Sequence, residues 1–279
     1  MKKFIAAFDG LKYATSTANC AIWLTKNTHA HLVGVFLDDR LYTSYKIYDL
    51  VVNEGVSDNR LKKYEEQDRA TRAAAADTFE IACQKEKLEY AIHHTQDIAI
   101  QELKHESIYA DMVIIDANET FTHYKEKPPT RFIRDLLDDT QCPVLLLPGK
   151  FKPIQKLVLL YDGEPSSVHA IKMFSYLLPQ LKHLETEVIS VNPTVSSLHL
   201  PDNRLMKEFM KRHFPKATYT VMKGLAEIEI IDHLKKQSSD TLVVLGAYKR
   251  GAVSRWFRES MADTLMRQVK LPLFVAHNK

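Results

Sequence analysis

The chain repeats itself at long range. Residues 4–10 (FIAAFDG) and 157–163 (LVLLYDG) are each an apolar run that ends in Asp-Gly. In each half, an aspartate that begins one apolar run is followed 31 residues later by the start of a second apolar run. These pairs of positions are Asp111 and Cys142 in the first half, and Asp240 and Leu271 in the second. Solenoid repeats have periods of about 20–50 residues. A repeat as long as this one therefore indicates two copies of one domain.

The length of 279 residues suits two domains, which we place at 1–150 and 154–279. The opening strands of the copies are offset by 153 residues and the closing strands by 129, so the first copy carries 24 extra residues. We place these at about 40–61 and in the long helix that follows. The linker GKFKP is short and contains proline, which predicts two closely packed halves.

Short apolar runs alternate with helical stretches in both halves. Strands are expected at 4–8, 30–37, 88–93, 112–116, 144–147, 157–161, 187–191, 218–222, 242–245 and 273–276. Helices are expected at 13–26, 59–87, 98–106, 130–139, 166–177, 203–213, 227–236 and 254–269. Continuous apolar strands that alternate with helices are typical of parallel sheets covered on both faces. The fold class is therefore α/β, with two tandem doubly wound parallel-sheet domains.

The charge, the cysteine content and the lengths of the apolar runs indicate which partners and which cellular location to expect. The net charge of +3 is too small to indicate nucleic acid or an anionic membrane as a partner, and we expect neither. Three cysteines without metal-type spacing predict reduced thiols. The first apolar run is too short for a signal peptide, and no stretch reaches the roughly 18 apolar residues of a membrane span. We expect a cytoplasmic protein.

Four features together resemble a tandem universal stress protein. They are Asp-Gly after strand one, the loop at 245–248 after strand four, the helix around 260–265 and the Leu-Pro-Leu-Phe-Val ending. The resemblance covers nearly the whole chain. It implies two five-stranded domains of the adenine nucleotide alpha hydrolase-like type, with strand order 3-2-1-4-5. It also implies an intramolecular pseudo-dimer along the last strands. A homodimer through the insertion and an unidentified protein partner are further expectations.

Family members that bind ATP hold adenine with an Asp after strand one and wrap the phosphates in a G-x2-G-x9-G-[ST] loop. Glycine lets backbone N–H groups approach phosphate, and the next helix N-terminus adds a favourable dipole. In the second half these positions are Gly246, Lys249, Glu259 and Ser260. In the first half they are Ala117, Thr120, Thr130 and Arg131. Both loops have lost glycines, which predicts degenerate nucleotide sites.

The resemblance assigns eight nucleotide-binding residues: Asp9, Asp162, Gly163, Gly246, Ala247, Lys249, Arg250 and Ser260. The cations around the second loop, Lys249, Arg250, Arg255 and Arg258, would replace the missing glycine N–H groups in an anion site. Asp9 and Asp162 also have a structural interpretation. An acidic residue between a strand and a helix caps the helix N-terminus.

We therefore expect a non-catalytic stress-response binding or regulatory protein, with no metal site and no certain cofactor. One alternative is a module that binds ATP with magnesium, or another adenine nucleotide, through the second half. A second is slow ATP hydrolysis, although the sequence lacks the P-loop, HExxH and GxSxG motifs. A third is a pure interaction protein whose pocket is filled by Tyr248, Trp256 or Phe257.

Overall fold

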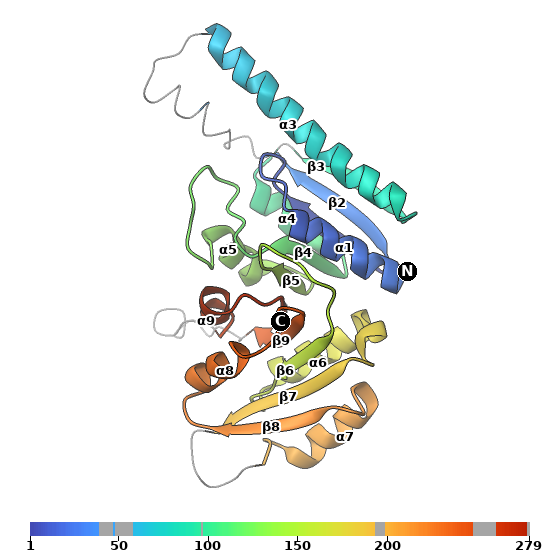
Figure 1. Ribbon diagram of the computed structural model, residues 1–279, viewed down its shortest axis with the longest axis vertical. Helices are drawn as coiled ribbons and strands as arrows, with labels where there is room; N and C mark the ends of the chain where they lie inside the picture. Colours follow the sequence, from blue (N-terminus) through green and yellow to red (C-terminus); the bar gives the residue numbers. More distant parts are fainter. Residues whose placement is uncertain (39–46, 48–57, 96, 193–198, 248–260, 278–279) are drawn as a thin grey trace. The chain divides into compact units, whose positions relative to one another are not determined.

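The computed structural model describes residues 1–38, 47, 58–95, 97–192, 199–247 and 261–277 (Figure 1). The chain folds into two compact units, residues 1–141 (unit 1) and 142–279 (unit 2). The division falls before strand β5 (Val144–Leu147), whereas the sequence placed the boundary after it. The reason is that β5 pairs antiparallel with β10 (Leu273–His277), and both strands belong to unit 2.

Unit 1 alternates strands and helices as predicted. Its elements are β1 (Lys3–Phe8), α1 (Thr15–Thr28), β2 (His31–Leu37), α3 (Asp58–Lys85), β3 (Tyr90–Thr95), α4 (Ala99–Ile108), β4 (Met112–Asp116) and α5 (Arg131–Asp139). The strands pair in the order β3-β2-β1-β4, and every pair is parallel. Most of the expected insertion at 40–61 lies outside the described residues. Its described part comprises Ile47, which is buried, and the first turn of α3.

Unit 2 repeats this order. Besides β5 and β10, its elements are β6 (Lys156–Leu160), α6 (Pro165–Leu177), the 3-10 turn η2 (Pro179–Leu181), β7 (Glu185–Asn192), α7 (Asn203–His213), β8 (Thr218–Lys223), α8 (Ala226–Leu234), β9 (Thr241–Ala247) and α9 (Met261–Gln268). The strands pair in the order β8-β7-β6-β9-β10, and these four pairs are parallel.

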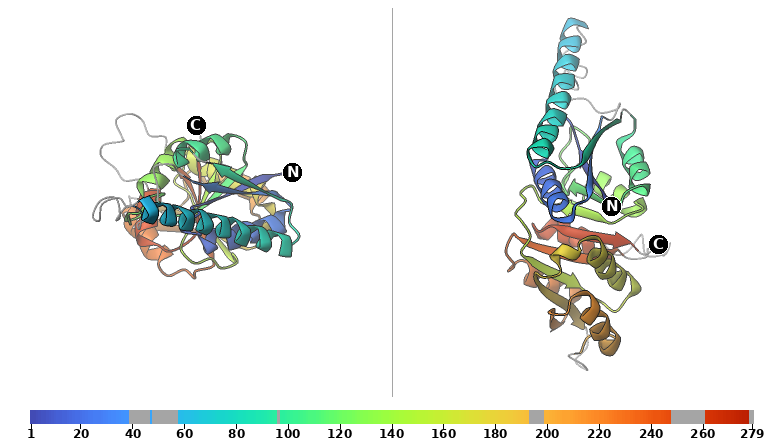
Figure 2. Two further views of the ribbon diagram at one scale, coloured as in Figure 1. Left: turned by 90° about the horizontal axis from the view of Figure 1, so that it is seen from above. Right: turned by 90° about the vertical axis from the view of Figure 1, so that its right-hand side faces the viewer.

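The predicted α/β fold class is confirmed. Helices cover both faces of each sheet: α1 and α3 against α4 and α5 in unit 1, and α6 and α7 against α8 and α9 in unit 2 (Figures 1 and 2). Strands such as β1 and β4 are therefore buried along nearly their whole length, as their continuous apolar sequences require. Among the described helices, none has both the length and the apolar character needed to cross a membrane.

Phe79 is the largest side chain that helix α3 buries against unit 1. Phe79 is fully buried, and its ring lies over Gly34 of β2. A methyl group at Gly34 would lie 2.5 Å from that ring, so only glycine leaves room for it. The helix spans 28 residues, about 42 Å, and its first half extends beyond the sheet (Figure 1).

Each unit contains an ionic network in which a glutamate contacts both a lysine and a histidine. In unit 1, Glu106 of α4 contacts Lys3 at 3.3 Å and His93 of β3 at 2.6 Å. Burial alone would raise the pKa of Glu106, but His93 and Lys3 hold it below its usual range. In unit 2, Glu187 lies 3.5 Å from Lys156 and 3.2 Å from His233. There the glutamate comes from a strand and the histidine from a helix, the reverse of unit 1.

Phe79→Ala should lower the free energy of unfolding of unit 1 by about 3–5 kcal/mol, because it empties the space between α3 and β2. Urea unfolding would measure the loss, and hydrogen exchange of β1 and β2 peptides would assign it to unit 1. Ile81→Ala is the matched control on the same helix. Its side chain is 64% exposed, so the change should stay within about 0.5 kcal/mol. Equal effects of the two substitutions would contradict this account of α3.

Candidate functional site

Parallel pairing brings the carboxyl ends of the strands to one edge of each sheet, where Asp9 follows β1 and Asp162 follows β6. The predicted helix-capping role of these residues is wrong. The Asp9 Oδ1 atom accepts a hydrogen bond from the Leu11 N–H at 2.8 Å, and Asp162 Oδ1 accepts one from the Glu164 N–H at 2.9 Å. Both bonds close short turns before the helices begin. The two carboxylates therefore fix the strand-to-helix turns.

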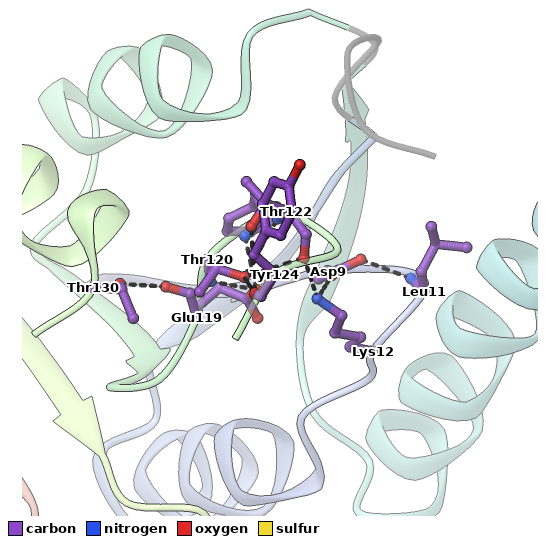
Figure 3. A network of polar contacts seen from close by, with 9 residues as sticks. Asp9, Leu11, Lys12, Glu119, Thr120, Thr122, Tyr124 and Thr130 are labelled. Carbon is purple, nitrogen blue, oxygen red and sulfur yellow. Dashed lines mark hydrogen bonds and ion pairs between the residues drawn. The ribbon is translucent and has the colours of Figure 1, made fainter. Parts of the chain in front are cut away.

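In unit 1 the segment at 117–130, between β4 and α5, folds over the strand ends. Its Glu119 side chain is only 7% exposed, and Glu119 Oε1 accepts hydrogen bonds from the N–H groups of Thr120 (2.9 Å) and Phe121 (3.1 Å). Figure 3 shows this carboxyl group in the same network as Asp9. The segment that would hold phosphates in an ATP-binding relative thus carries an acidic side chain into the site.

Lys12 joins the two sides of this network. Its Nζ atom lies 4.0 Å from Asp9 Oδ2 and donates a hydrogen bond to the carbonyl oxygen of Thr122 (Figure 3). Asp9 is fully buried, whereas about half of the Lys12 side chain is exposed. The lysine therefore offsets part of the buried negative charge and attaches segment 117–130 to the turn after β1.

The two acidic groups interact electrostatically. Burial is the main reason that the pKa of Glu119 is raised to about 7, and the negative charge of Asp9 adds to the effect. The Phe121 and Thr120 N–H groups and Lys12 act in the opposite direction. A phosphate at this place would lie beside two acidic side chains, and like charges repel each other.

Residues aligned with the phosphate-binding loop have structural contacts instead. Thr130 caps α5 by accepting a hydrogen bond from the Ile133 N–H at 3.2 Å, and its hydroxyl donates to the Glu119 carbonyl. Phe121 is buried and packs on Phe132, with ring centroids 4.4 Å apart. These contacts hold segment 117–130 against α5.

Aromatic rings fill the remaining space at the strand ends of unit 1. Phe8 and Phe36 are paired in the β1–β2 register, and their ring centroids lie 5.1 Å apart. Phe79 lies 5.1 Å from Phe8, and Tyr13 lies 5.2 Å from it. Together these rings occupy the position where unit 2 has a pocket.

The pocket of unit 2 has a volume of about 60 Å³. Its lining comprises Leu160, Tyr161, Asp162, Ser167, Ile189, Ser190, Val191, Ala226, Ile230, Leu245, Gly246 and Met261. Tyr161 precedes Asp-Gly in unit 2, as Phe8 does in unit 1. Because Leu160 pairs with Ile189, the next residues, Tyr161 and Ser190, are equivalent to the paired Phe8 and Phe36. Ser190 is 1% exposed, and its hydroxyl has no hydrogen-bond partner among the described residues. The pocket therefore combines apolar walls with a buried hydroxyl and the Asp162 carboxylate.

Two predicted site glycines are also required by the backbone. Gly163 has φ +89°, a left-handed conformation that favours glycine. A methyl group at Gly246 would lie 2.4 Å from the carbonyl carbon and oxygen of Ser166, at the start of α6. Gly246 therefore allows β9 to pack closely on α6, whether or not it contacts a ligand.

The structure brings Asp162 and Gly246 together in the pocket, with Gly163 next to Asp162 in sequence. Asp9 lies in the network of unit 1, and Ala247 ends β9 opposite His277. The predicted Lys249, Arg250 and Ser260 lie outside the described residues. So do Arg255, Arg258 and Glu259 and the three aromatic residues expected to fill the pocket, Tyr248, Trp256 and Phe257.

Sequence reasoning missed Glu119 and Ser190. Glu119 is the only acidic residue between Asp116 and Lys125, but the sequence does not indicate that its side chain points inward. Ser190 stands where the first repeat has Phe36, and a residue-by-residue alignment of the second strands of the two repeats would have revealed that exchange.

The raised pKa of Glu119 predicts a pH-dependent stability. The folded state holds the Glu119 proton from about pH 4.5, the ordinary value, to about pH 7, so stability decreases as pH rises through this window. In Glu119→Gln, the free energy of unfolding should fall by about 3 kcal/mol less between pH 4.5 and pH 8 than it does in the unmodified protein. Urea unfolding at a series of pH values would measure this difference. The control is Glu65→Gln on the exposed surface of α3, which should leave the profile unchanged. Parallel profiles for Glu119→Gln and the unmodified protein would contradict the prediction.

Solved structures with this fold span the whole chain. A universal stress protein from Archaeoglobus fulgidus superposes with a TM-score of 0.70 at 12% identity, covering 99% of this chain and 98% of its own. A provisionally named universal stress protein from Pseudomonas aeruginosa gives a TM-score of 0.62 at 14% identity, with coverage of 99% and 93%. No family model matches the sequence, and no curated protein matches it. The chain thus has the fold of the universal stress proteins along nearly its entire length, as the sequence resemblance predicted.

Proposed function

We propose that this protein is a non-catalytic stress-response binding or regulatory protein in which only unit 2 takes up a small ligand. The observation that carries the proposal is the difference between the two strand-end sites. In unit 1, segment 117–130 and the rings of Phe8 and Phe36 occupy the site. In unit 2, Tyr161 and Ser190 border a pocket at the corresponding place.

The pocket suits a ligand with a flat apolar part and at least one polar group. Ile189, Val191 and Leu245 provide apolar walls, and the buried Ser190 hydroxyl requires a hydrogen-bond partner. An adenine nucleotide fits this description and is the leading candidate. Asp162 and Gly246, two of the residues that the resemblance assigned to nucleotide binding, line the pocket.

Absence of catalysis is part of the proposal. The recognised hydrolase and P-loop motifs are missing from the sequence, and the resemblance suggests binding rather than turnover. The described residues contain no cluster of three or more potential metal ligands. We propose that magnesium enters together with the phosphates of the nucleotide.

Two aspects of assembly and location belong to the same proposal. β5, the last strand of the first repeat, pairs with β10, the last strand of the second, which supports an intramolecular pseudo-dimer. A homodimer through residues 40–61 and an unidentified protein partner remain expectations from the sequence.

The cysteines support a location in a reducing compartment such as the cytoplasm. All three are buried and form no disulfide: Cys20, Cys83 and Cys142.

Ser190→Phe tests the nucleotide interpretation, because it introduces into unit 2 the ring that unit 1 has at Phe36. Millimolar ATP with magnesium should raise the melting temperature of the unmodified protein, a stabilisation of about 2.7 kcal/mol at a hundredfold excess over Kd. Ser190→Phe should abolish this shift. Ala117→Phe, at the unit 1 position aligned with Gly246, should retain it. Substitutions of Gly246 itself are unsuitable, because they would disturb the packing on α6.

Three results would contradict parts of the proposal. No shift with ATP would remove nucleotides as the ligand class. A shift that persists in Ser190→Phe but disappears in Ala117→Phe would place the site in unit 1. Phosphate release from ATP that is lost in Asp162→Ala would show that the protein is an enzyme.

A further inference from the structure

Positive charge is concentrated in the second half of the chain. Residues 142–279 contain 20 Lys and Arg against 12 Asp and Glu, a net charge of +8. Residues 1–141 contain 18 against 23, a net charge of −5. The small total of +3, from which we expected no nucleic-acid partner, conceals this difference. Local distribution is the better guide to electrostatic partners.

Part of this charge lies on one side of unit 2, where α6, η2 and α7 cover the sheet (Figure 1). We call this surface the basic-aromatic face, and it comprises Lys172, Tyr176, Lys182, Lys207, Phe209, Lys211, His213 and Tyr219. Lys207 and Lys211 are exposed and lie one helical turn apart on α7. Glu208 is the only acidic residue of that helix.

The lysines of this face lack ion pairs within the described part of the chain. Lys172, Lys182, Lys207 and Lys211 form no ion pair with any residue that the structure describes. By contrast, Lys3, Lys26, Lys104 and Lys156 all contact carboxylates. The charge of the basic-aromatic face is therefore available to an anionic partner.

Aromatic rings lie among these cations. Tyr176 is 55% exposed, and its ring packs 5.4 Å from His213, which in turn lies 4.1 Å from Phe209. The Lys207 ammonium group lies 6.0 Å from the centre of the Tyr219 ring, itself 37% exposed. His213 is fixed by a hydrogen bond between its Nδ1 atom and Ser175 Oγ. Tyr176, His213 and Phe209 therefore form a row of rings between α6 and α7, and Tyr219 of β8 lies beside Lys207.

Two histidines of unit 2, His169 and His213, lie near these lysines. Burial is the main reason that the pKa of His213 is lowered, and Lys182 and Lys172 add to the effect. The pKa of His169 is lowered by burial and by Lys172. Lys172 of α6 and Lys182, which follows η2, therefore both lie near His213 at the end of α7.

We propose that the basic-aromatic face binds single-stranded nucleic acid. Lysines contact phosphates without regard to sequence, and exposed rings stack on bases that are free of a duplex. An acidic protein segment would use the lysines but would gain nothing from the row of rings. The face lies on the α6–α7 side of the sheet and not at the strand ends, so this proposal does not depend on the ligand of the pocket.

Fluorescence anisotropy of a labelled 15-nucleotide oligouridylate with the full-length protein tests the proposal. The double variant Lys172→Glu/Lys211→Glu should weaken binding at least tenfold at 50 mM salt and reduce the salt dependence of log K by about 1.4. Tyr176→Ala should weaken binding about fivefold or more, and Tyr176→Phe, which keeps the ring, should restore it.

Lys235→Glu/Lys236→Glu provides the matched control, because it reverses two exposed lysines at the end of α8, on the other face of the sheet. It should weaken binding by less than twofold. The proposal is overturned if oligouridylate does not bind at 50 mM salt, or if the α8 control weakens binding as much as the α6–α7 variant. It is also overturned if Tyr176→Ala has no effect while polyglutamate competes as well as oligouridylate, which would indicate an acidic protein partner.

Discussion

Parallel strand pairing determines where chemistry is available in this protein. It brings the turns after β1 and β4 together in unit 1, and those after β6 and β9 together in unit 2. Asp9 and Asp162 hold these turns through the same hydrogen bond to the N–H group two residues later. A side chain at a strand end is therefore close to the turns that follow the neighbouring strands. This proximity is why Glu119, which follows β4, lies close enough to Asp9, which follows β1, for the two carboxyl groups to interact.

The two repeats have diverged at packing positions next to this shared frame. β2 has Gly34 and Phe36, and the equivalent positions of β7 are Val188 and Ser190. Glycine admits the ring of Phe79 from α3, and Phe36 then completes the aromatic cluster. In unit 2 the small side chain of Ser190 lines the pocket instead. The ionic networks of the two units use equivalent lysines at the start of β1 and β6. The glutamate is on a helix and the histidine on a strand in unit 1, and the reverse holds in unit 2.

The sequence predicted the fold well because the patterns that indicate strands and helices are local in sequence and occur in both repeats. The expected strands at 112–116 and 144–147 and the helix at 203–213 match the observed elements at both ends. The site was harder to predict because it depends on the direction in which side chains point and form hydrogen bonds. Asp9 and Asp162 are correctly placed at strand ends, yet the direction of their hydrogen bonds depends on where the next helices begin, at Thr15 and Pro165. Glu119 lies in a segment without periodicity, so no pattern indicates that its side chain is buried.

Helix α6 links the pocket and the basic-aromatic face. Its first turn touches Gly246 through the Ser166 backbone, and Ser167 lines the pocket. Tyr176, nine residues further along, lies on the basic-aromatic face, about 13 Å away along the helix axis. A ligand that moved the start of α6 would therefore move the row of rings, because a helix transmits displacement along its axis. Any such coupling is reciprocal by linkage, so an anionic partner on the face would change the affinity of the pocket by the same factor.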